Sequence, residues 1–170
     1  MIGTGRALPV SVNLSARQFN DPKLVELVAR VLKESGLPAA LLEIEIPEAA
    51  AMQHPDVALP TLRKLKDLGV LLTLDDFGIG LSGVSHLRRF PLDRLKIDRS
   101  FIAEVERNGD HRAIVAAIIA LAQVLNLKVV AEGVETEGQK QFLRGFGCEE
   151  VQGYLTGRPV DADTAAKDFL

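Results

Sequence analysis

The sequence predicts an α/β protein with a (β/α)8 TIM-barrel-like fold, of which about six of the eight βα units are present in the chain. Short apolar or β-branched runs alternate with longer segments of helical period. The strand segments are almost continuously apolar, which is typical of a parallel sheet covered by helices. A polar residue stands at or near the end of each strand segment, as at the active rim of a barrel. A doubly wound open sheet would instead predict a glycine-rich phosphate loop after an early strand. GxxxxGK[ST] does not occur, and GxGxxG occurs only as GIGLSG (78–83), shortly after the paired aspartates that follow the third strand segment.

The composition supports a folded domain and excludes several classes of protein. The chain has 170 residues, of which 47% are hydrophobic, so it can build one sizeable core. A formal net charge of -3 argues against binding of long nucleic acids. The single cysteine, Cys148, excludes an internal disulfide and is expected to fill a small space in the core. The longest apolar run, 113–122, is too short to span a bilayer, and no signal segment opens the chain, so we expect a cytoplasmic protein without a membrane segment.

The first half of the chain is expected to contain three βα units. Its strands are predicted at Leu8–Leu14, Leu42–Ile46 and Val70–Leu74. The first helix begins at Asp21 as the N-cap with Pro22 in the first turn, and it ends at Gly36. The second helix, Pro55–Leu68, places leucines on one face, and a short helical turn is expected over Ser82–Arg89.

The second half of the chain repeats the pattern. Strands are predicted at Arg94–Ile97, Lys128–Ala131 and Glu150–Tyr154. The helix His111–Leu125 is apolar almost all round and should be well buried, Thr136–Phe146 follows, and Asp161–Phe169 is a weak terminal helix. A closed barrel needs eight strands and typically about 250 residues, so roughly two N-terminal units are expected to be absent and the barrel to be open.

The polar residues at the strand ends are mostly carboxylates. They are Asn13, Glu45, Asp75, Asp76, Lys96, Glu132 and Gln152. Carboxylates that converge at the end of apolar strands are costly to bury without positive charge, and one lysine cannot balance four of them. Hard divalent cations can, and carboxylate and amide oxygens suit Mg²⁺ or Mn²⁺. Two such ions about 3.5–4 Å apart are the usual apparatus for phosphoester displacement.

Each of these residues also has an ordinary structural explanation. A single strand-end carboxylate is more often a helix cap or a surface charge, Asn13 a turn residue and Lys96 a solvated lysine. The repetition from strand to strand favours a functional site. The loop after Asp76 carries Gly78, Gly80 and Gly83, which indicates either an ordinary turn or a close approach to a ligand.

Six segments of the chain resemble motifs of the EAL-domain cyclic di-GMP phosphodiesterases, in the same order. They read VNLSARQ (Val12–Gln18), LEIEIPE (Leu42–Glu48), LDDFGIGLSGVSHL (Leu74–Leu87), LKIDRSFI (Leu95–Ile102), AEGVET (Ala131–Thr136) and QGYLTGRP (Gln152–Pro159). The resemblance covers nearly the whole chain. It implies a single, partial EAL domain over residues 1–170, with a (β/α)8-type fold, that hydrolyses cyclic di-GMP to linear pGpG with Mg²⁺ or Mn²⁺.

The resemblance also implies roles for the metal-binding residues. By similarity, Asn13, Glu45 and Asp75 are metal ligands, and Asp76 holds or bridges the second ion. The physical argument from converging carboxylates agrees with these roles.

The remaining family positions concern the water and the loop. Lys96 is similar to the residue that positions the catalytic water, Glu132 to the proposed general base and Glu135 to a supporting carboxylate. Gln152 is similar to a residue that aligns the water or ligates a metal, and Glu48 to one that anchors the loop after Asp76.

Departures from the family pattern leave two hypotheses open. The strand with the Glu-Ala-Leu motif, whose glutamate ligates metal, is not in the chain, and Pro47 replaces a threonine. Ile79, Leu81, Gly83 and Val84 change the loop that couples the metals to the family's dimer interface. The first hypothesis is a phosphodiesterase of which this chain alone is slow or inactive. The second is a catalytically degenerate cyclic di-GMP receptor or dimerisation module. Both imply cyclic di-GMP and a second copy of the chain, as a homodimer, as partners.

Overall fold

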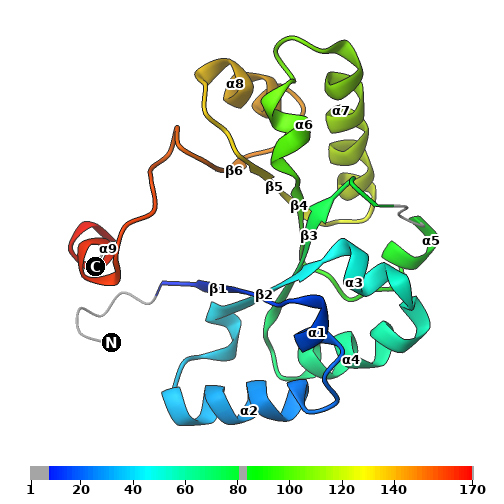
Figure 1. The fold of residues 1–170 in the computed structure, drawn as a ribbon, viewed down its shortest axis with the longest axis vertical. Coiled ribbons are helices and arrows are strands. Elements are labelled where there is room, and N and C mark those ends of the chain that lie inside the picture. The colour runs from blue at the N-terminus through cyan, green and yellow to red at the C-terminus, as the bar shows by residue number, and fades with distance from the viewer. Residues whose placement is uncertain (1–7, 81–83, 170) are drawn as a thin grey trace.

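The computed structural model describes residues 8–80 and 84–169. Six parallel strands form one sheet in chain order, β1 to β6, and the sheet curls into part of a barrel (Figure 1). The strands are β1 (Val10–Asn13), β2 (Leu42–Pro47), β3 (Leu71–Phe77), β4 (Arg94–Ile97), β5 (Lys128–Glu132) and β6 (Glu150–Gln152). Each strand pairs in parallel with the next, from β1 with β2 to β5 with β6. The prediction of an open, barrel-like parallel sheet is therefore confirmed.

Helices connect the strands and lie mainly on the outer side of the curve (Figure 1). They are α1 (Ala16–Phe19), α2 (Leu24–Ser35), the 3-10 turn η1 (Ala39–Leu41), α3 (Glu48–Gln53), α4 (Pro55–Asp67), α5 (Val84–Leu87), α6 (Arg99–Ala103), α7 (Gly109–Val124), α8 (Glu137–Gly145) and α9 (Ala162–Phe169). In the described part of the chain, none of them is long and apolar enough to cross a membrane.

Some predicted boundaries differ from those observed. Asp21 is not the N-cap of α2, because its carboxylate accepts a hydrogen bond from the Lys23 amide (2.8 Å) in a preceding turn, and the helix starts at Leu24. The first and last strands are shorter than predicted, whereas β3 continues past Leu74 to Phe77. Ser82 lies outside the described residues. The helices α1, α3 and α6 were missed, because four to six residues are too few to show a helical period.

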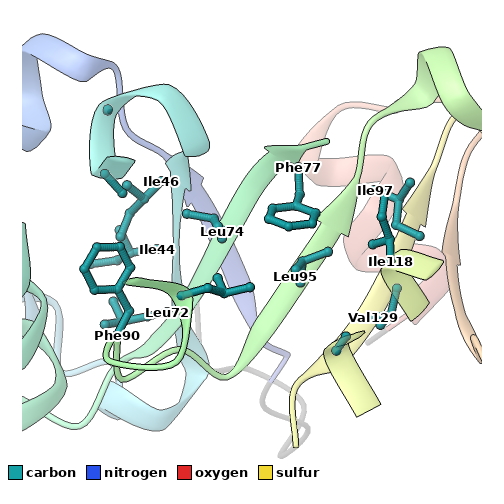
Figure 2. Packing of buried hydrophobic residues seen from close by; sticks show 14 of the residues in the cluster. Ile44, Ile46, Leu72, Leu74, Phe77, Phe90, Leu95, Ile97, Ile118 and Val129 are labelled. Carbon is teal, nitrogen blue, oxygen red and sulfur yellow. The ribbon is translucent and has the colours of Figure 1, made fainter. Parts of the chain in front are cut away.

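The two faces of the sheet differ in chemistry because successive side chains along a strand alternate between them. On the outer face, apolar side chains such as Ile46, Leu74 and Leu95 pack beneath the helices, as Figure 2 shows together with Phe90 from the loop after α5. The residues that alternate with them face the inside of the curve. There the buried residues include Glu43, Glu45, Thr73 and Lys96, all less than 9% exposed. The core therefore lies between sheet and helices, and the barrel interior is polar.

One expectation about burial, that of α7, is wrong, and the first strand is the exposed edge of the open sheet. The first strand, β1, is exposed along its whole length, with Val10 47% and Val12 44% exposed, because it lies at the edge of the sheet and, among the residues that the structure describes, pairs only with β2. Helix α7 is not buried all round. Its inner side, with Val115 and Ile119, packs toward the sheet, whereas Val124 on another side is 78% exposed. Cys148 is fully buried, as predicted for a core filler.

Candidate functional site

The carboxyl ends of the strands bring the predicted polar residues to one rim. In the strand register Asn13 lies opposite Glu45, and Glu132 opposite Gln152. Lys96 lies on β4, between these two pairs. Parallel strands with matched ends necessarily gather such residues at one edge of the sheet.

Lys96 is the centre of a buried ion cluster. Its ammonium Nζ lies 2.5 Å from Glu132 Oε1, 2.7 Å from Glu45 Oε2 and 3.5 Å from Asp75 Oδ1. The lysine is only 4% exposed, so the charges attract each other through little water. Burial alone would lower the pKa of Lys96, but the hydrogen bonds from its ammonium to Glu132 and Glu45 raise it above its ordinary value. The lysine is therefore held in its charged form.

The end of β3 has an irregular backbone that presents two adjacent carboxylates. The pairing register with β4 shifts between Leu74 and Phe77, and Asp76 adopts a φ of 56°, a left-handed conformation that aspartate tolerates better than most residues. The Asp76 amide donates to Asp75 Oδ1 at 3.0 Å. Desolvation and the negative charges of Asp75 and Asp98 raise the pKa of Asp76.

Two groups of oxygen atoms meet at Asp75. Asp75, Asp76 and Glu132 each place a carboxylate oxygen within 4.8 Å of the others. On the other side, the Asn13 amide faces Glu45 Oε2 and Asp75 Oδ2. In one orientation of the amide, the Asn13 nitrogen donates hydrogen bonds to Glu45 Oε2 (2.9 Å) and Asp75 Oδ2 (3.2 Å). In the other orientation, the Asn13 oxygen lies beside these two carboxylate oxygens, so that three oxygens converge. An oxygen-only donor set of this kind fits a hard divalent cation, which a set rich in sulfur or imidazole would not.

Glu132 and Glu48 have different surroundings. Burial raises the pKa of Glu132, the Lys96 ammonium opposes that rise, and the charges of Asp75 and Glu45 add to it.

Glu48 is 2% exposed, and its Oε2 accepts hydrogen bonds from the amides of Gly78 (3.0 Å) and Gly80 (3.3 Å). The carboxylate of Glu48 therefore ties α3 to the loop after Asp76.

Other predicted site residues lie at the same rim without joining the ion cluster. Gln152 ends β6 with an exposed side chain. Glu135 is also exposed on the loop after β5, and within 8–80 and 84–169 no hydrogen bond or ion pair links its carboxylate to Lys96. Of the altered loop positions, Ile79 is 65% exposed and Val84 50%, whereas Leu81 and Gly83 lie outside the described residues.

The sequence analysis missed four polar residues close to the site. Asp98, 8% exposed, caps α6 by accepting from the Ser100 amide at 2.8 Å, and it adds negative charge near Asp76. Glu43, Thr73 and Arg94 form a second layer inside the curve, each two residues before a predicted site residue on the same strand. A search two residues upstream and downstream of each strand-end residue would have found all four.

A curled parallel sheet with a carboxylate-rich rim defines a (β/α)-barrel-like domain. The chain belongs to the EAL domain family, whose sequence model matches residues 2–159. A relative, the cyclic di-GMP phosphodiesterase NbdA of Pseudomonas aeruginosa, is 48% identical over 163 residues, which are 96% of this chain and 21% of NbdA. The chain thus spans about a fifth of the length of this relative.

Solved structures support the same assignment. The c-di-GMP complex of the PaMucR phosphodiesterase superposes with a TM-score of 0.90 at 46% identity, over 92% of this chain and 64% of that one. BlrP1 of Klebsiella pneumoniae, in a complex with manganese and cyclic di-GMP, gives a TM-score of 0.81 at 33% identity, over 89% of this chain and 39% of that one. The family therefore includes proteins that hold a divalent metal together with cyclic di-GMP.

Proposed function

We propose that this chain is the EAL unit of a cyclic di-GMP phosphodiesterase of bacterial second-messenger signalling, which hydrolyses cyclic di-GMP to linear pGpG with Mg²⁺ or Mn²⁺. One observation carries the proposal. Asp75 lies between two groups of oxygen atoms, Asn13 with Glu45 and Asp76 with Glu132, beside the buried ammonium of Lys96. The c-di-GMP complex of PaMucR and the phosphodiesterase NbdA support this substrate.

The donor atoms suggest how the cations would be held. Asn13, Glu45 and Asp75 would ligate one ion, and Asp75 would be shared with a second ion that Asp76 would hold or bridge. When bound, such ions stabilise negative charge on a phosphoryl group and lower the pKa of a water molecule. In the reaction, a water oxygen attacks one phosphorus atom and the P–O3′ bond breaks, which opens the ring to pGpG.

The remaining residues would position the water and move its proton. The Lys96 ammonium, fixed by three carboxylates, would supply positive charge beside the phosphate. Glu132 would take the proton of the water on its carboxylate, as a general base beside Lys96. Gln152 would align the water or ligate a metal, Glu135 would support the site, and Glu48 would anchor the loop through Gly78 and Gly80.

The alternative, a catalytically degenerate cyclic di-GMP receptor or dimerisation module, is not favoured. It was suggested by Pro47 and the altered loop. Pro47 ends β2 and precedes α3 without displacing Glu45 from Lys96 or Glu48 from the loop. The relative NbdA is named as a phosphodiesterase.

The expected partners and extent of the domain remain proposals. The chain matches 64% of the PaMucR chain, and we expect further strands of one EAL domain to pair with the exposed edge at β1. Homodimer formation and a cytoplasmic location stay predictions. The 170-residue chain alone is expected to turn over slowly or not at all, because misplacement of a reacting group by about 1 Å can lower a rate about 100-fold.

The test measures pGpG formation from cyclic di-GMP with MnCl₂. It compares the 170-residue chain with the polypeptide encoded by the complete reading frame that contains it. Asp75→Asn should abolish activity and weaken Mn²⁺ binding measured by calorimetry, because it removes the shared carboxylate. Glu132→Gln should lower kcat by about 10²–10⁴-fold, the usual contribution of a general base.

The matched control is Glu137→Gln, since Glu137 also pairs with a lysine (Lys140, 3.5 Å) but lies on the surface in α8. This variant should retain parental activity. Parental Mn²⁺ affinity in Asp75→Asn would refute the ligand assignment. Silence of the complete polypeptide as well as of the short chain, with cyclic di-GMP still bound, would favour the receptor alternative.

A further inference from the structure

A second layer of charged groups lies inside the curve, one step below the rim. Arg94 on β4 contacts Glu43 on β2, with 2.6 Å between Nη1 and Oε2, and Glu150 on β6, with 3.4 Å between Nη2 and Oε2. Glu43, 4% exposed, also accepts hydrogen bonds from the hydroxyls of Thr73 and Ser11. The lower layer, defined as Glu43, Thr73, Arg94 and Glu150, is thus linked from β2 to β6.

The reach of Arg94 is unusual for a residue in a parallel sheet. Neighbouring strands lie about 4.8 Å apart, so β2 and β6 are each about 10 Å from β4 along a flat sheet. The Arg94 guanidinium bridges both distances, across β3 on one side and β5 on the other. A concave sheet, as Figure 1 shows it to be, shortens both distances. Arg94 therefore links the curvature of the sheet to two ion pairs.

The lower layer is in register with the rim. Glu43 precedes Glu45, Arg94 precedes Lys96 and Glu150 precedes Gln152, each by two residues on the same strand. Residues two apart on a strand share a face and lie about 6.6 Å apart. Fixing the three lower side chains relative to one another consequently fixes the strands that carry the three rim residues.

The ion pairs at the rim itself would be weakened by cations. Lys96 contacts Glu45 and Asp75, to which the proposed function assigns the cations, and Glu132 beside them. A cation bound to these oxygens reduces their attraction for the lysine. Glu43 and Glu150 lie one step away and keep their pairing with Arg94.

We infer that Arg94 is a positioning residue, which through Glu43 and Glu150 holds β2 and β6 at the separation required for the rim residues to act together. The inference rests on the proposed function. An ordinary structural role would make Arg94 important for stability only. A positioning role predicts that cation affinity, kcat and sheet curvature change beyond any loss of stability.

The test uses variants chosen to remain folded. Arg94→Met alone would leave Glu43 buried without its cation, so the main variant is the double substitution Arg94→Met/Glu43→Gln. Arg94→Lys keeps the charge but loses the forked guanidinium that reaches both sides. The control is Lys66→Met, which breaks an ion pair of the same 2.6 Å length with Asp93, between α4 and the start of β4 rather than inside the curve.

Three measurements are made on each variant: calorimetric Mn²⁺ affinity, kcat and KM of the complete polypeptide, and sheet curvature. Curvature is measured by double electron–electron resonance, as the distance between two nitroxide spin labels. The labels are attached to Val57→Cys in α4 and Val124→Cys in α7, and Cys148 is replaced by alanine so that no other thiol reacts. Both valines are more than 70% exposed, so the labels disturb little.

The double variant should bind Mn²⁺ more weakly, broaden the distance distribution and lose about 100-fold in kcat with a small change in KM. Arg94→Lys should fall between it and the parent, and Lys66→Met should match the parent in all three measurements. A parental distance distribution in the double variant, or an equal loss in Lys66→Met, would overturn the inference. Inactivity of the parent would count against the proposed function instead, and the distance measurement would still test Arg94.

Discussion

Replacement of Lys96 by methionine tests the balance of charge in the site. The substitution keeps the length of the side chain and removes its positive charge from among Glu45, Asp75 and Glu132. The Lys96 and Glu45 side chains are 5% and 8% exposed, so this ion pair is buried. Removing one partner of a buried pair costs about 3–5 kcal/mol, because the remaining charge is left without compensation. We expect the free energy of unfolding of the metal-free chain to fall by this amount in Lys96→Met.

Manganese should reverse part of that loss. Without Lys96, a cation meets three carboxylates that no longer pair with a lysine, so it should bind the variant more tightly than the parent. A ligand at a hundredfold excess over its Kd stabilises a folded protein by about 2.7 kcal/mol. The assay is urea unfolding followed by circular dichroism, for parent and Lys96→Met, in EDTA and in MnCl₂. The difference in unfolding free energy between the two proteins should shrink when manganese is present.

The control variant is again Lys66→Met, whose ion pair with Asp93 has side chains that are 35% and 28% exposed. A more exposed pair contributes less, about 1 kcal/mol or below, and its loss should not depend on manganese. The reasoning is refuted if Lys96→Met in EDTA loses no more than Lys66→Met. It is also refuted if manganese stabilises Lys96→Met no more than it stabilises the parent.

Two further predictions concern the buried groups of Glu48 and Cys148. Glu48→Ala should lose about 1–3 kcal/mol, because a buried acceptor of two amides disappears, and hydrogen exchange at Gly78 and Gly80 should accelerate selectively. Burial raises the pKa of Cys148 from 9.0 to about 11, so its thiol should resist iodoacetamide at pH 8 until the chain unfolds. Because the folded thiol keeps its proton to higher pH than the unfolded one, the free energy of unfolding should fall by about 3 kcal/mol between pH 9 and pH 11. Unfolding of Cys148→Ala should not show this pH dependence.

The sequence predicted those features of the fold that recur in every unit. Each strand carried the same signal, an apolar run that ends in a polar residue, so one mistaken boundary could not change the topology. The rim residues Asn13, Glu45, Asp75 and Glu132 were predictable for the same reason. Their roles come from the resemblance to the EAL family, and the experiments above test them.

The remaining features depend on contacts that a linear pattern does not contain. Glu43 and Arg94 read as ordinary charges within apolar strands, and only the curvature of the sheet brings them together across β3. The exposure of Val10 does not follow from the strand's own sequence, since an apolar strand looks the same at an edge and at the centre of a sheet; it follows from the position of β1 at the edge of the open sheet. Asp98 was missed because a helix as short as α6 gave no reason to look for a cap.

Because the interior of the curve is polar, its ion pairs should affect metal binding more than they affect the stability of the fold. Closed TIM barrels are filled mainly by branched apolar side chains, whereas this half-barrel places Glu43 and Arg94 in the corresponding position. A buried ion pair is weak evidence for stability, since apolar residues of similar volume often replace it without loss. Its geometry is directional, however, and an apolar pair would not hold β2, β4 and β6 at fixed separations. The double variant Glu43→Leu/Arg94→Met should therefore unfold at the same urea concentration as the parent and yet bind Mn²⁺ more weakly. This result would show that the lower layer determines the geometry of the site rather than the stability of the fold.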